Sequence, residues 1–243
     1  MSTRKIYGLI GKNIDYSFSA KYFQEKFEKE GIINSRYINF DLDKIEDFNN
    51  IKIKSINGLN VTIPYKEKII PLLDEIDKSA MEIGAVNTIA INDNKLIGYN
   101  TDFIGFINSF EQKMNFQNAV ILGTGGASKA IQYALNSKKI KYDIASRKID
   151  KNYISYDSIN QNLNNYDLII NTTPIGTFPA TKDKPKLNYS LISKNHFCYD
   201  LIYNPEKTSF LLECEKMGAK IMNGLRMLKS QAEESWRIWN SFS

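Results

Sequence analysis

A short apolar run, a glycine-rich turn and an amphipathic segment follow one another between residues 120 and 135. Val120-Ile121-Leu122 is long enough for a buried parallel strand, and residues 127–135 carry apolar side chains at helical spacing. This order predicts an α/β sheet and is the context of a dinucleotide fingerprint, because glycines let the backbone approach a pyrophosphate and a helix N-terminus offers it N–H groups. The candidate pyrophosphate contacts are Gly123, Gly125, Gly126 and Ala127. Since the third fingerprint position is Ser128, a tight turn without a nucleotide is the alternative.

The strand expected at residues 140–145 ends in a basic cluster that bears on the choice of cofactor. A site for NAD(H) would carry Asp or Glu about 20 residues beyond the glycines, where it binds the ribose 2′-hydroxyl. This chain carries Ser146, Arg147 and Lys148 there. A guanidinium can bind a 2′-phosphate through paired hydrogen bonds and can stack on adenine, whereas a carboxylate would repel the phosphate. The cluster therefore favours NADP(H), and a solvated basic strand end is the alternative.

Composition and charge limit the remaining classes. The 243 residues suit one large or two modest domains, with a hydrophobic content of 42% that is ordinary for a globular protein. Acidic residues are interspersed among the basic ones and the net charge is only +5, so we expect a small anionic partner and no nucleic acid. His196, Cys198 and Cys214 lack metal-ligand spacing, so we expect no metal, a surface or strand-edge histidine, and buried reduced cysteines. No apolar stretch approaches about 18 residues and the start of the chain has no apolar signal region, so we expect no membrane partner and a cytoplasmic location.

The order of expected elements predicts two α/β domains, each with a mainly parallel sheet. Strands are expected at 5–10, 36–40, 58–62, 86–91, 95–98, 120–122, 140–145, 166–171 and 197–201, and helices at 20–30, 44–50, 67–73, 76–83, 103–112, 127–135 and 224–242. The last helix could return to the first domain. We therefore expect a substrate domain of residues 1–101 plus 224–243 and a Rossmann-like NADP domain of residues 102–223.

Several short blocks, taken together in their order and spacing, resemble the shikimate dehydrogenase family over nearly the whole chain. The blocks are Ser17-Phe18-Ser19, Asn60-Val61-Thr62-Ile63-Pro64-Tyr65-Lys66, Gly84-Ala85-Val86-Asn87-Thr88, Gly98-Tyr99-Asn100-Thr101-Asp102, Gly123 to Ala127, Asn171-Thr172-Thr173-Pro174-Ile175-Gly176, Asp200-Leu201-Ile202-Tyr203-Asn204-Pro205 and Asn223-Gly224-Leu225 with Gln231-Ala232. The resemblance implies reversible NADPH-dependent reduction of 3-dehydroshikimate to shikimate, a reaction of aromatic amino acid biosynthesis. The chain departs from the family pattern at Tyr16, Ala20, Ser146, Lys148 and Arg226.

The resemblance also implies roles for individual residues. Lys66 would be the general acid/base and Asp102 its partner, although residue type alone also fits a surface lysine and a helix cap. The residues implied for substrate binding are Ser17, Ser19, Asn60, Thr62, Asn87, Tyr203 and Gln231. Those implied near the nicotinamide and its ribose are Thr172, Thr173, Ile202 and Gly224.

Two other functions are compatible with the same pattern. One is a quinate/shikimate dehydrogenase that uses either NAD or NADP. The absence of an acid after residue 145 argues against the use of NAD. The other is a non-catalytic NADP-binding regulator on the same scaffold, against which the presence of both Lys66 and Asp102 argues. A monomer and a homodimer are both compatible with the sequence.

Overall fold

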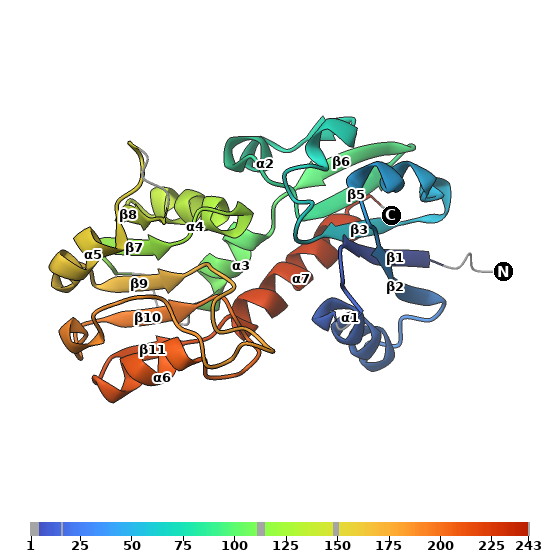
Figure 1. The fold of residues 1–243 in the computed structure, drawn as a ribbon. Coiled ribbons are helices and arrows are strands. Elements are labelled where there is room, and N and C mark those ends of the chain that lie inside the picture. The colour runs from blue at the N-terminus through green and yellow to red at the C-terminus, as the bar shows by residue number, and fades with distance from the viewer. Residues whose placement is uncertain (1–4, 16, 111–114, 148–150, 243) are drawn as a thin grey trace. The chain divides into compact units, whose positions relative to one another are not determined.

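The computed structural model describes residues 5–15, 17–110, 115–147 and 151–242, and within these ranges the chain forms two compact α/β units (Figure 1). The first unit comprises Met1–Thr101 with Gln231–Ser243, and the second comprises Asp102–Ser230. The C-terminal helix α7 (Leu225–Asn240) therefore begins in the second unit and ends in the first. The expected α/β class with mainly parallel sheets is confirmed.

The first unit is built on a six-stranded sheet in the order β2-β1-β3-β5-β6-β4. Five strands share one direction, because β1 pairs in parallel with β2 and β3, β4 pairs in parallel with β6, and β5 alone runs antiparallel to both of its neighbours. The strands are β1 (Lys5–Gly11), β2 (Ser35–Asp41), β3 (Gly58–Val61), β4 (Glu75–Ile76), β5 (Thr88–Asn92) and β6 (Lys95–Tyr99). β5 and β6 form the expected hairpin, in which Asp93 and Asn94 adopt positive φ angles.

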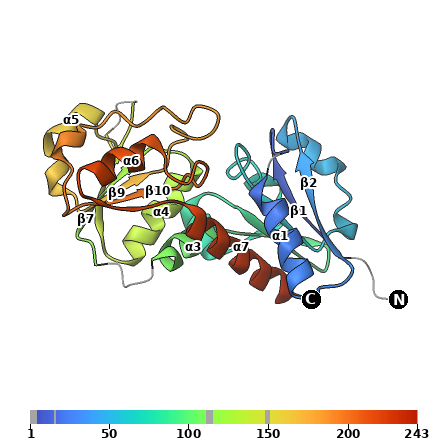
Figure 2. The same ribbon diagram turned by 90° about the horizontal axis from the view of Figure 1, so that it is seen from below.

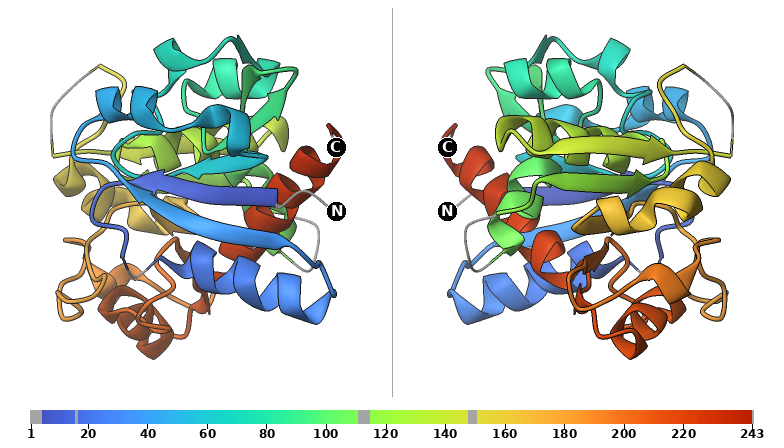
Figure 3. Two further views of the ribbon diagram at one scale, coloured as in Figure 1. Left: turned by 90° about the vertical axis from the view of Figure 1, so that its right-hand side faces the viewer. Right: turned by 90° about the vertical axis from the view of Figure 1, so that its left-hand side faces the viewer.

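Helices cover both faces of this sheet. On one face lie α1 (Phe18–Lys29) and the C-terminal part of α7 (Figure 2). They contribute Phe23, Phe27, Ala232 and Trp239 to a core that also contains Tyr7 of β1. The left panel of Figure 3 shows α1 on one side of the strands and short helical segments on the other. Those segments are η1 (Ile45–Asn50), η2 (Ile53–Ser55), η3 (Ile70–Leu72) and α2 (Lys78–Ile83).

The second unit contains a five-stranded, wholly parallel sheet in the order β11-β10-β9-β7-β8. Its strands are β7 (Asn118–Leu122), β8 (Lys141–Ala145), β9 (Leu168–Asn171), β10 (Phe197–Asp200) and β11 (Lys220–Met222). Its helices are α3 (Asp102–Ser109), α4 (Gly126–Ser137), α5 (Tyr156–Asn162) and α6 (Ser209–Lys216), with the 3-10 helices η4 (Leu163–Asn165) and η5 (Tyr189–Leu191).

Alternate residues of the central strands enter two different cores. Ile121 and Ile170 pack with Phe106 of α3 and Ile131 of α4, whereas Val120 and others pack with residues of α5 and α6 on the opposite face. Because both faces are covered, these strands read as continuous apolar runs, which is typical of parallel sheets.

The structure differs from the sequence expectations at several elements. The helix expected at residues 67–73 is wrong, since only η3 is helical there and Pro71 lies within it. Strands β4 and β11 and helices α5 and α6 were not expected from the pattern. The two strands have only two and three residues, too few to show a period of their own.

Candidate functional site

The glycine turn lies at the carboxyl end of β7, between β8 on one side and β9 on the other. This is the point where the strand order of the sheet reverses, and ligands of open α/β sheets bind at such points. Gly123 has a φ of +111°, and a Cβ atom there would lie 2.8 Å from the Thr172 hydroxyl oxygen. A Cβ at Gly125 would meet nothing within 4 Å, and α4 begins at the next residue. The turn therefore presents the N–H groups of a helix N-terminus beside open space.

Ser128 occupies the third fingerprint position without disturbing the packing of α4. Its side chain is fully buried, and its hydroxyl oxygen accepts a hydrogen bond from Gln132 Nε2 at 3.2 Å. Since this position requires a small side chain for close helix–strand packing, serine satisfies the requirement.

The basic cluster follows β8, the strand adjacent to β7. Ser146 is half-buried, and its N–H donates to the Ile154 carbonyl at 3.0 Å. Arg147 is exposed and close enough to lower the pKa of Tyr156, although burial raises that pKa overall. Lys148 lies outside the described residues. A solvent-exposed guanidinium at this strand end suits a phosphate ligand.

The residues expected around the nicotinamide lie where β9 and β10 end. The Thr172 hydroxyl donates to the Leu122 carbonyl at 2.7 Å, which ties the end of β9 to the glycine turn. Ile202 is buried, and its carbonyl accepts from the Gly224 N–H at 3.1 Å. Only glycine fits at position 224, because a Cβ there would lie 2.0 Å from the Leu201 carbonyl oxygen. Tyr203 is half-buried, and burial raises its pKa.

Asp200 is a buried acid that we did not select as a site residue from the sequence. Burial raises its pKa to about 6, against the opposing effect of hydrogen bonds from Thr208, the Ile202 N–H and Asn171. Its signal in the sequence is an acid that directly follows the apolar run of β10. Such acids with perturbed pKa values cluster at functional sites.

In the first unit, three of the block residues converge on one amide. Asn87 Oδ1 accepts from the Thr101 N–H at 2.7 Å, and Asn87 Nδ2 donates to the Thr101 hydroxyl oxygen at 2.9 Å and to Gln231 Oε1 at 3.3 Å. Asn87 and Gln231 are separated by 144 positions in the chain. The return of α7 to this unit therefore brings two of the expected substrate-binding amides together.

Asn60 belongs to the same polar cluster but is directed into the protein. Its Nδ2 donates to the Ser235 hydroxyl oxygen at 3.0 Å and to the Asn87 carbonyl at 3.2 Å. Its Oδ1 accepts from the Tyr37 hydroxyl at 2.8 Å, and the residue is 5% exposed. Asn60 therefore holds its neighbours in place. Sequence reasoning missed Ser235, which lies one helical turn after Gln231.

The two serines of the early block lie at the start of α1. Ser17 is the N-cap, and its hydroxyl oxygen accepts from the Ser19 N–H at 3.2 Å. The Ser19 side chain hydrogen-bonds to Tyr37, the same tyrosine that donates to Asn60. Both serines are half-buried. The N-terminus of a helix with two hydroxyl groups suits a carboxylate ligand.

Thr62 and Lys66 lie in the turn region after β3. Both are half-buried, the Thr62 N–H donates to the Ile10 carbonyl at 2.8 Å, and the Lys66 carbonyl accepts from the Val86 N–H at 2.7 Å. Asp102 is the first residue of α3 and is 6% exposed. Because Lys66 belongs to the first unit and Asp102 to the second, their convergence stays a prediction.

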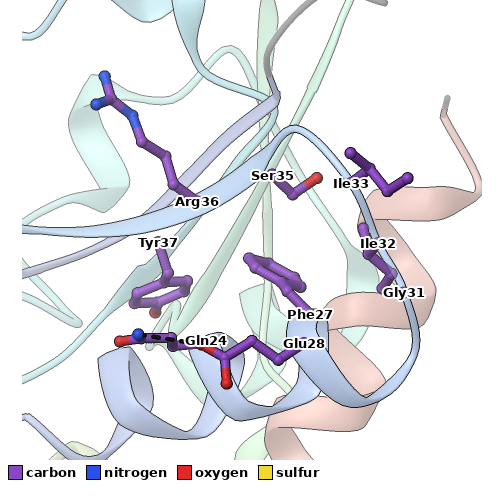
Figure 4. Close-up of a pocket in the computed structure, with 9 residues that line it drawn as sticks. All are labelled: Gln24, Phe27, Glu28, Gly31, Ile32, Ile33, Ser35, Arg36 and Tyr37. Atoms are coloured by element: carbon purple, nitrogen blue, oxygen red, sulfur yellow. Dashed lines mark hydrogen bonds between the residues drawn. The ribbon is translucent and has the colours of Figure 1, made fainter.

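Two hollows in the surface lie elsewhere. One, of about 510 Å³, lies where α1 ends and β2 begins, with the rings of Phe27 and Tyr37 between helix and strand (Figure 4). Another, of about 190 Å³, is lined in part by Asp167 and His196. His196 is 4% exposed and its Nε2 lies 3.3 Å from the Leu163 carbonyl oxygen. It directly precedes β10, so of the two expected positions the strand edge is correct and the surface is wrong. Neither hollow is lined by an expected site residue.

Three further properties concern cysteines, metal ligands and membrane spans within the described residues. Cys198 and Cys214 are free and buried, as expected. Within the described ranges, no cluster of three or more His, Cys, Asp or Glu side chains could hold a metal ion. None of the helices in those ranges has the length and apolarity needed to cross a membrane.

A parallel sheet with a glycine turn at its switch point and a basic neighbouring strand end is typical of the dinucleotide-binding class of NADP-dependent enzymes. The family model for the shikimate dehydrogenase substrate binding domain matches residues 9–89. A shikimate dehydrogenase (NADP(+)) from Methanococcus maripaludis is 39% identical, over 98% of this chain and 92% of its own. One from Clostridium botulinum is 41% identical, over 96% and 95%. The chain belongs to the shikimate dehydrogenase family.

Solved structures agree with this assignment. The shikimate 5-dehydrogenase of Thermus thermophilus, solved in complex with NADP(H) and shikimate, superimposes with a TM-score of 0.87 at 25% identity. The match covers 97% of this chain and 93% of that one. The similarity therefore extends over both units.

Proposed function

We propose that this protein is an NADP-dependent shikimate dehydrogenase, which interconverts 3-dehydroshikimate and shikimate in aromatic amino acid biosynthesis. The observation that carries the proposal is membership of the family over nearly the whole chain, at 39% identity to a relative of that name. The site geometry supports it, because each unit supplies groups suited to one of the two ligands.

The second unit fits the cofactor. The open space beside Gly125 and the N-terminus of α4 suit the pyrophosphate, and Arg147 suits the 2′-phosphate. When bound, NADPH supplies the hydride that reduces the C3 ketone. Gly123, Gly126, Ala127 and Ser146 border the same strand ends, and Thr172, Thr173, Ile202 and Gly224 would border the nicotinamide and its ribose.

The first unit fits a small polyhydroxylated acid. Ser17 and Ser19 at the start of α1 would bind the carboxylate, and Thr62, Asn87 and Gln231 would bind the hydroxyl groups. Asn60 would contribute by fixing Asn87 through the Asn87 carbonyl. Tyr203 would also bind the substrate, as in the family pattern.

Lys66 would manage the proton. Reduction of a ketone leaves an alkoxide that must gain a proton, and the reverse reaction requires a base at the same oxygen. A lysine ammonium can donate this proton and the resulting amine can accept it. Asp102 would orient the ammonium and accept a hydrogen bond from a substrate hydroxyl.

The remaining assignments form part of the proposal. Residues 1–101 with 224–243 would bind the substrate and residues 102–223 the cofactor. The protein would act in the cytoplasm as a monomer or a homodimer, which fractionation and light scattering would test.

The decisive experiment measures the near-ultraviolet absorbance of reduced nicotinamide with shikimate or quinate against NADP⁺ or NAD⁺. We expect shikimate with NADP⁺ to react fastest of the four pairs. Comparable rates with quinate and with NAD⁺ would favour a quinate/shikimate dehydrogenase instead. NADP⁺ binding without turnover of either substrate would favour a regulator.

A further inference from the structure

The Asp200 carboxylate connects the ends of two strands to a helix start. Its Oδ1 accepts from Asn171 Nδ2 at 3.1 Å and from the Ile202 N–H at 3.0 Å. Its Oδ2 accepts from the Thr208 hydroxyl at 2.6 Å. Asp200 ends β10, Asn171 ends β9 and Thr208 is the N-cap of α6. One side chain therefore holds three elements together at one edge of the sheet.

The same hydrogen bonds continue to residues that would border the nicotinamide. Asn171 Oδ1 accepts from the Thr173 N–H at 3.1 Å and from the Thr173 hydroxyl at 2.6 Å. Asn171 thus donates to Asp200 on one side and accepts from Thr173 on the other. The Ile202 carbonyl in turn accepts from the Gly224 N–H at 3.1 Å. Hydrogen bonds therefore link Asp200, through Asn171 and Ile202, to Thr173 and Gly224.

An acid at the position of Asp200 is costly to bury. Asp200 is fully buried, and burying a carboxylate costs free energy that its three donors only partly offset. An ionised carboxylate is acceptor-only, so it can accept from all three donors at once, which an apolar side chain cannot do. The buried carboxylate therefore lowers the stability of the protein and, in return, fixes the geometry of the loops after β9 and β10.

We propose that Asp200 is a positioning residue, whose carboxylate fixes the loops after β9 and β10 in the conformation that receives the nicotinamide end of NADP(H). The assignment of those loops to the cofactor rests on the proposed function. Asp200 acts through Asn171 and Ile202 and does not itself contact the reacting atoms.

The test compares Asp200→Leu and Asp200→Asn by calorimetric titration with NADP⁺ without substrate, and by the KM values of NADP⁺ and shikimate. Asp200→Leu leaves three buried donors unsatisfied, so we expect the NADP⁺ Kd and KM to rise about tenfold or more, with the shikimate KM within about twofold. In Asp200→Asn, the amide oxygen can accept from Asn171 and Ile202 and the amide nitrogen can donate to Thr208. We expect that variant to keep the NADP⁺ Kd within about threefold of wild type.

Asp167 offers a matched control at the opposite end of β9. Its carboxylate accepts from the N–H groups of Gln117 at 2.7 Å and Asn118 at 3.0 Å. Asp167→Leu should lower the unfolding temperature and leave the NADP⁺ Kd unchanged. An Asp200→Leu protein that folds with an unchanged NADP⁺ Kd overturns the proposal, as does an equal loss of NADP⁺ affinity in Asp167→Leu.

A second variant decides the question if Asp200→Leu does not fold. Asn171→Ala separates Asp200 from Thr173 while leaving Asp200 its Ile202 and Thr208 donors, so it should also raise the NADP⁺ Kd; an unchanged Kd would refute the proposal. Failure of this proposal can be distinguished from failure of the proposed function. If the wild-type protein binds NADP⁺ but does not oxidise shikimate, the proposed function fails, and the NADP⁺ Kd values of the variants still test the role of Asp200.

Discussion

At the scale of single residues, both units contain buried hydrogen-bonded polar side chains, and the second also exposes a charged group. In the first unit, amides and hydroxyls such as Asn87 and Thr101 hydrogen-bond to one another inside the protein. In the second, Arg147 is exposed and Gly125 has no neighbour where a side chain would be. Single substitutions should therefore separate cofactor binding, proton transfer and stability.

Arg147→Ala should weaken binding of NADP(H) selectively. Removal of a charge-assisted contact to the 2′-phosphate should raise the NADPH KM about tenfold or more and leave the shikimate KM nearly unchanged. Steady-state kinetics with both substrates varied would measure this, with NADH as the control cofactor because it lacks the phosphate. An unchanged NADPH KM would end the assignment of Arg147.

Lys66→Ala should impair catalysis with little effect on binding. Loss of the general acid/base should lower kcat by about 10² to 10⁴-fold, while calorimetric affinities for NADP⁺ and shikimate stay within a few fold. Lys66→Arg is the matched variant, since it keeps the positive charge but cannot release a proton near neutral pH. Full turnover by Lys66→Ala would remove the lysine from the mechanism.

Asp200 should make stability depend on pH. Its pKa is raised from 3.8 to about 6 by burial, so the folded state binds this proton more tightly than the unfolded state does. The contribution of this group to the free energy of unfolding is fully present below the unfolded-state pKa and is lost as the pH rises through the folded-state pKa. The loss is about 3 kcal/mol, at 1.36 kcal/mol per unit of difference between the two pKa values. Tyr189, Tyr199 and Cys214 also interact with Asp200, and all three stay neutral in this range. Burial raises the pKa of each tyrosine, and the hydrogen bond with Cys198 together with burial raises the pKa of Cys214.

Urea unfolding of wild type and Asp200→Asn at pH 4.5 and pH 7 would measure this contribution. Relative to Asp200→Asn, which cannot titrate, wild type should lose stability between the two pH values. A stability difference between the two proteins that does not change with pH would contradict the raised pKa.

At the scale of elements, α7 and β3 show how a glycine permits a packing arrangement. A Cβ at Gly58 would lie 2.4 Å from the ring of Trp239, which is 1% exposed and donates from Nε1 to the Ile89 carbonyl at 3.0 Å. The indole therefore lies directly on β3, and its N–H reaches the carbonyl of the adjacent strand β5.

Gly58→Ala should displace this indole from the sheet. Overpacking at a filled site costs about 1 to 3 kcal/mol, and the hydrogen bond to Ile89 would be lost as well. Denaturant unfolding followed by tryptophan fluorescence would measure both effects. Gly125→Ala provides a contrasting control for stability, because a Cβ there meets nothing within 4 Å and its φ is −78°. Equal stability of Gly58→Ala and wild type would contradict the packing described.

At the scale of the whole molecule, the two units have separate cores and separate ligand assignments. The core of the first contains Tyr7, Phe23 and Trp239, and the cores of the second surround β7 and β9. Ligands stabilise the parts of a protein that they contact and whose local opening they suppress.

Hydrogen exchange should therefore respond to each ligand in a different unit. NADP⁺ alone should slow exchange at residues 120–135 and 171–173, and shikimate alone should slow exchange at residues 17–20, 60–66 and 87–88. Mass spectrometry of peptides from the protein with each ligand would measure the pattern. Protection of residues 120–135 by shikimate alone would contradict the division of ligands between the units.

The sequence by itself determined the α/β class, the glycine-rich turn between strand and helix, and the family. Local features carry this information: a glycine-rich turn such as that at residues 123–126 needs particular φ angles and free space, and apolar periodicity reports which faces are buried. The sequence blocks that resemble the family could be recognised for the same reason, since each lies within one continuous stretch of the chain.

Tertiary structure alone decided which of those residues meet. Asn87 and Gln231 hydrogen-bond across 144 positions because α7 returns to the first unit, and Asn60 is directed inward because Tyr37 and Ser235 satisfy its amide. The ionisation of Asp200 likewise depends on burial and on donors from β9 and α6. Hydrogen bonding and desolvation act through space between distant segments, so no local pattern in the chain could have specified them.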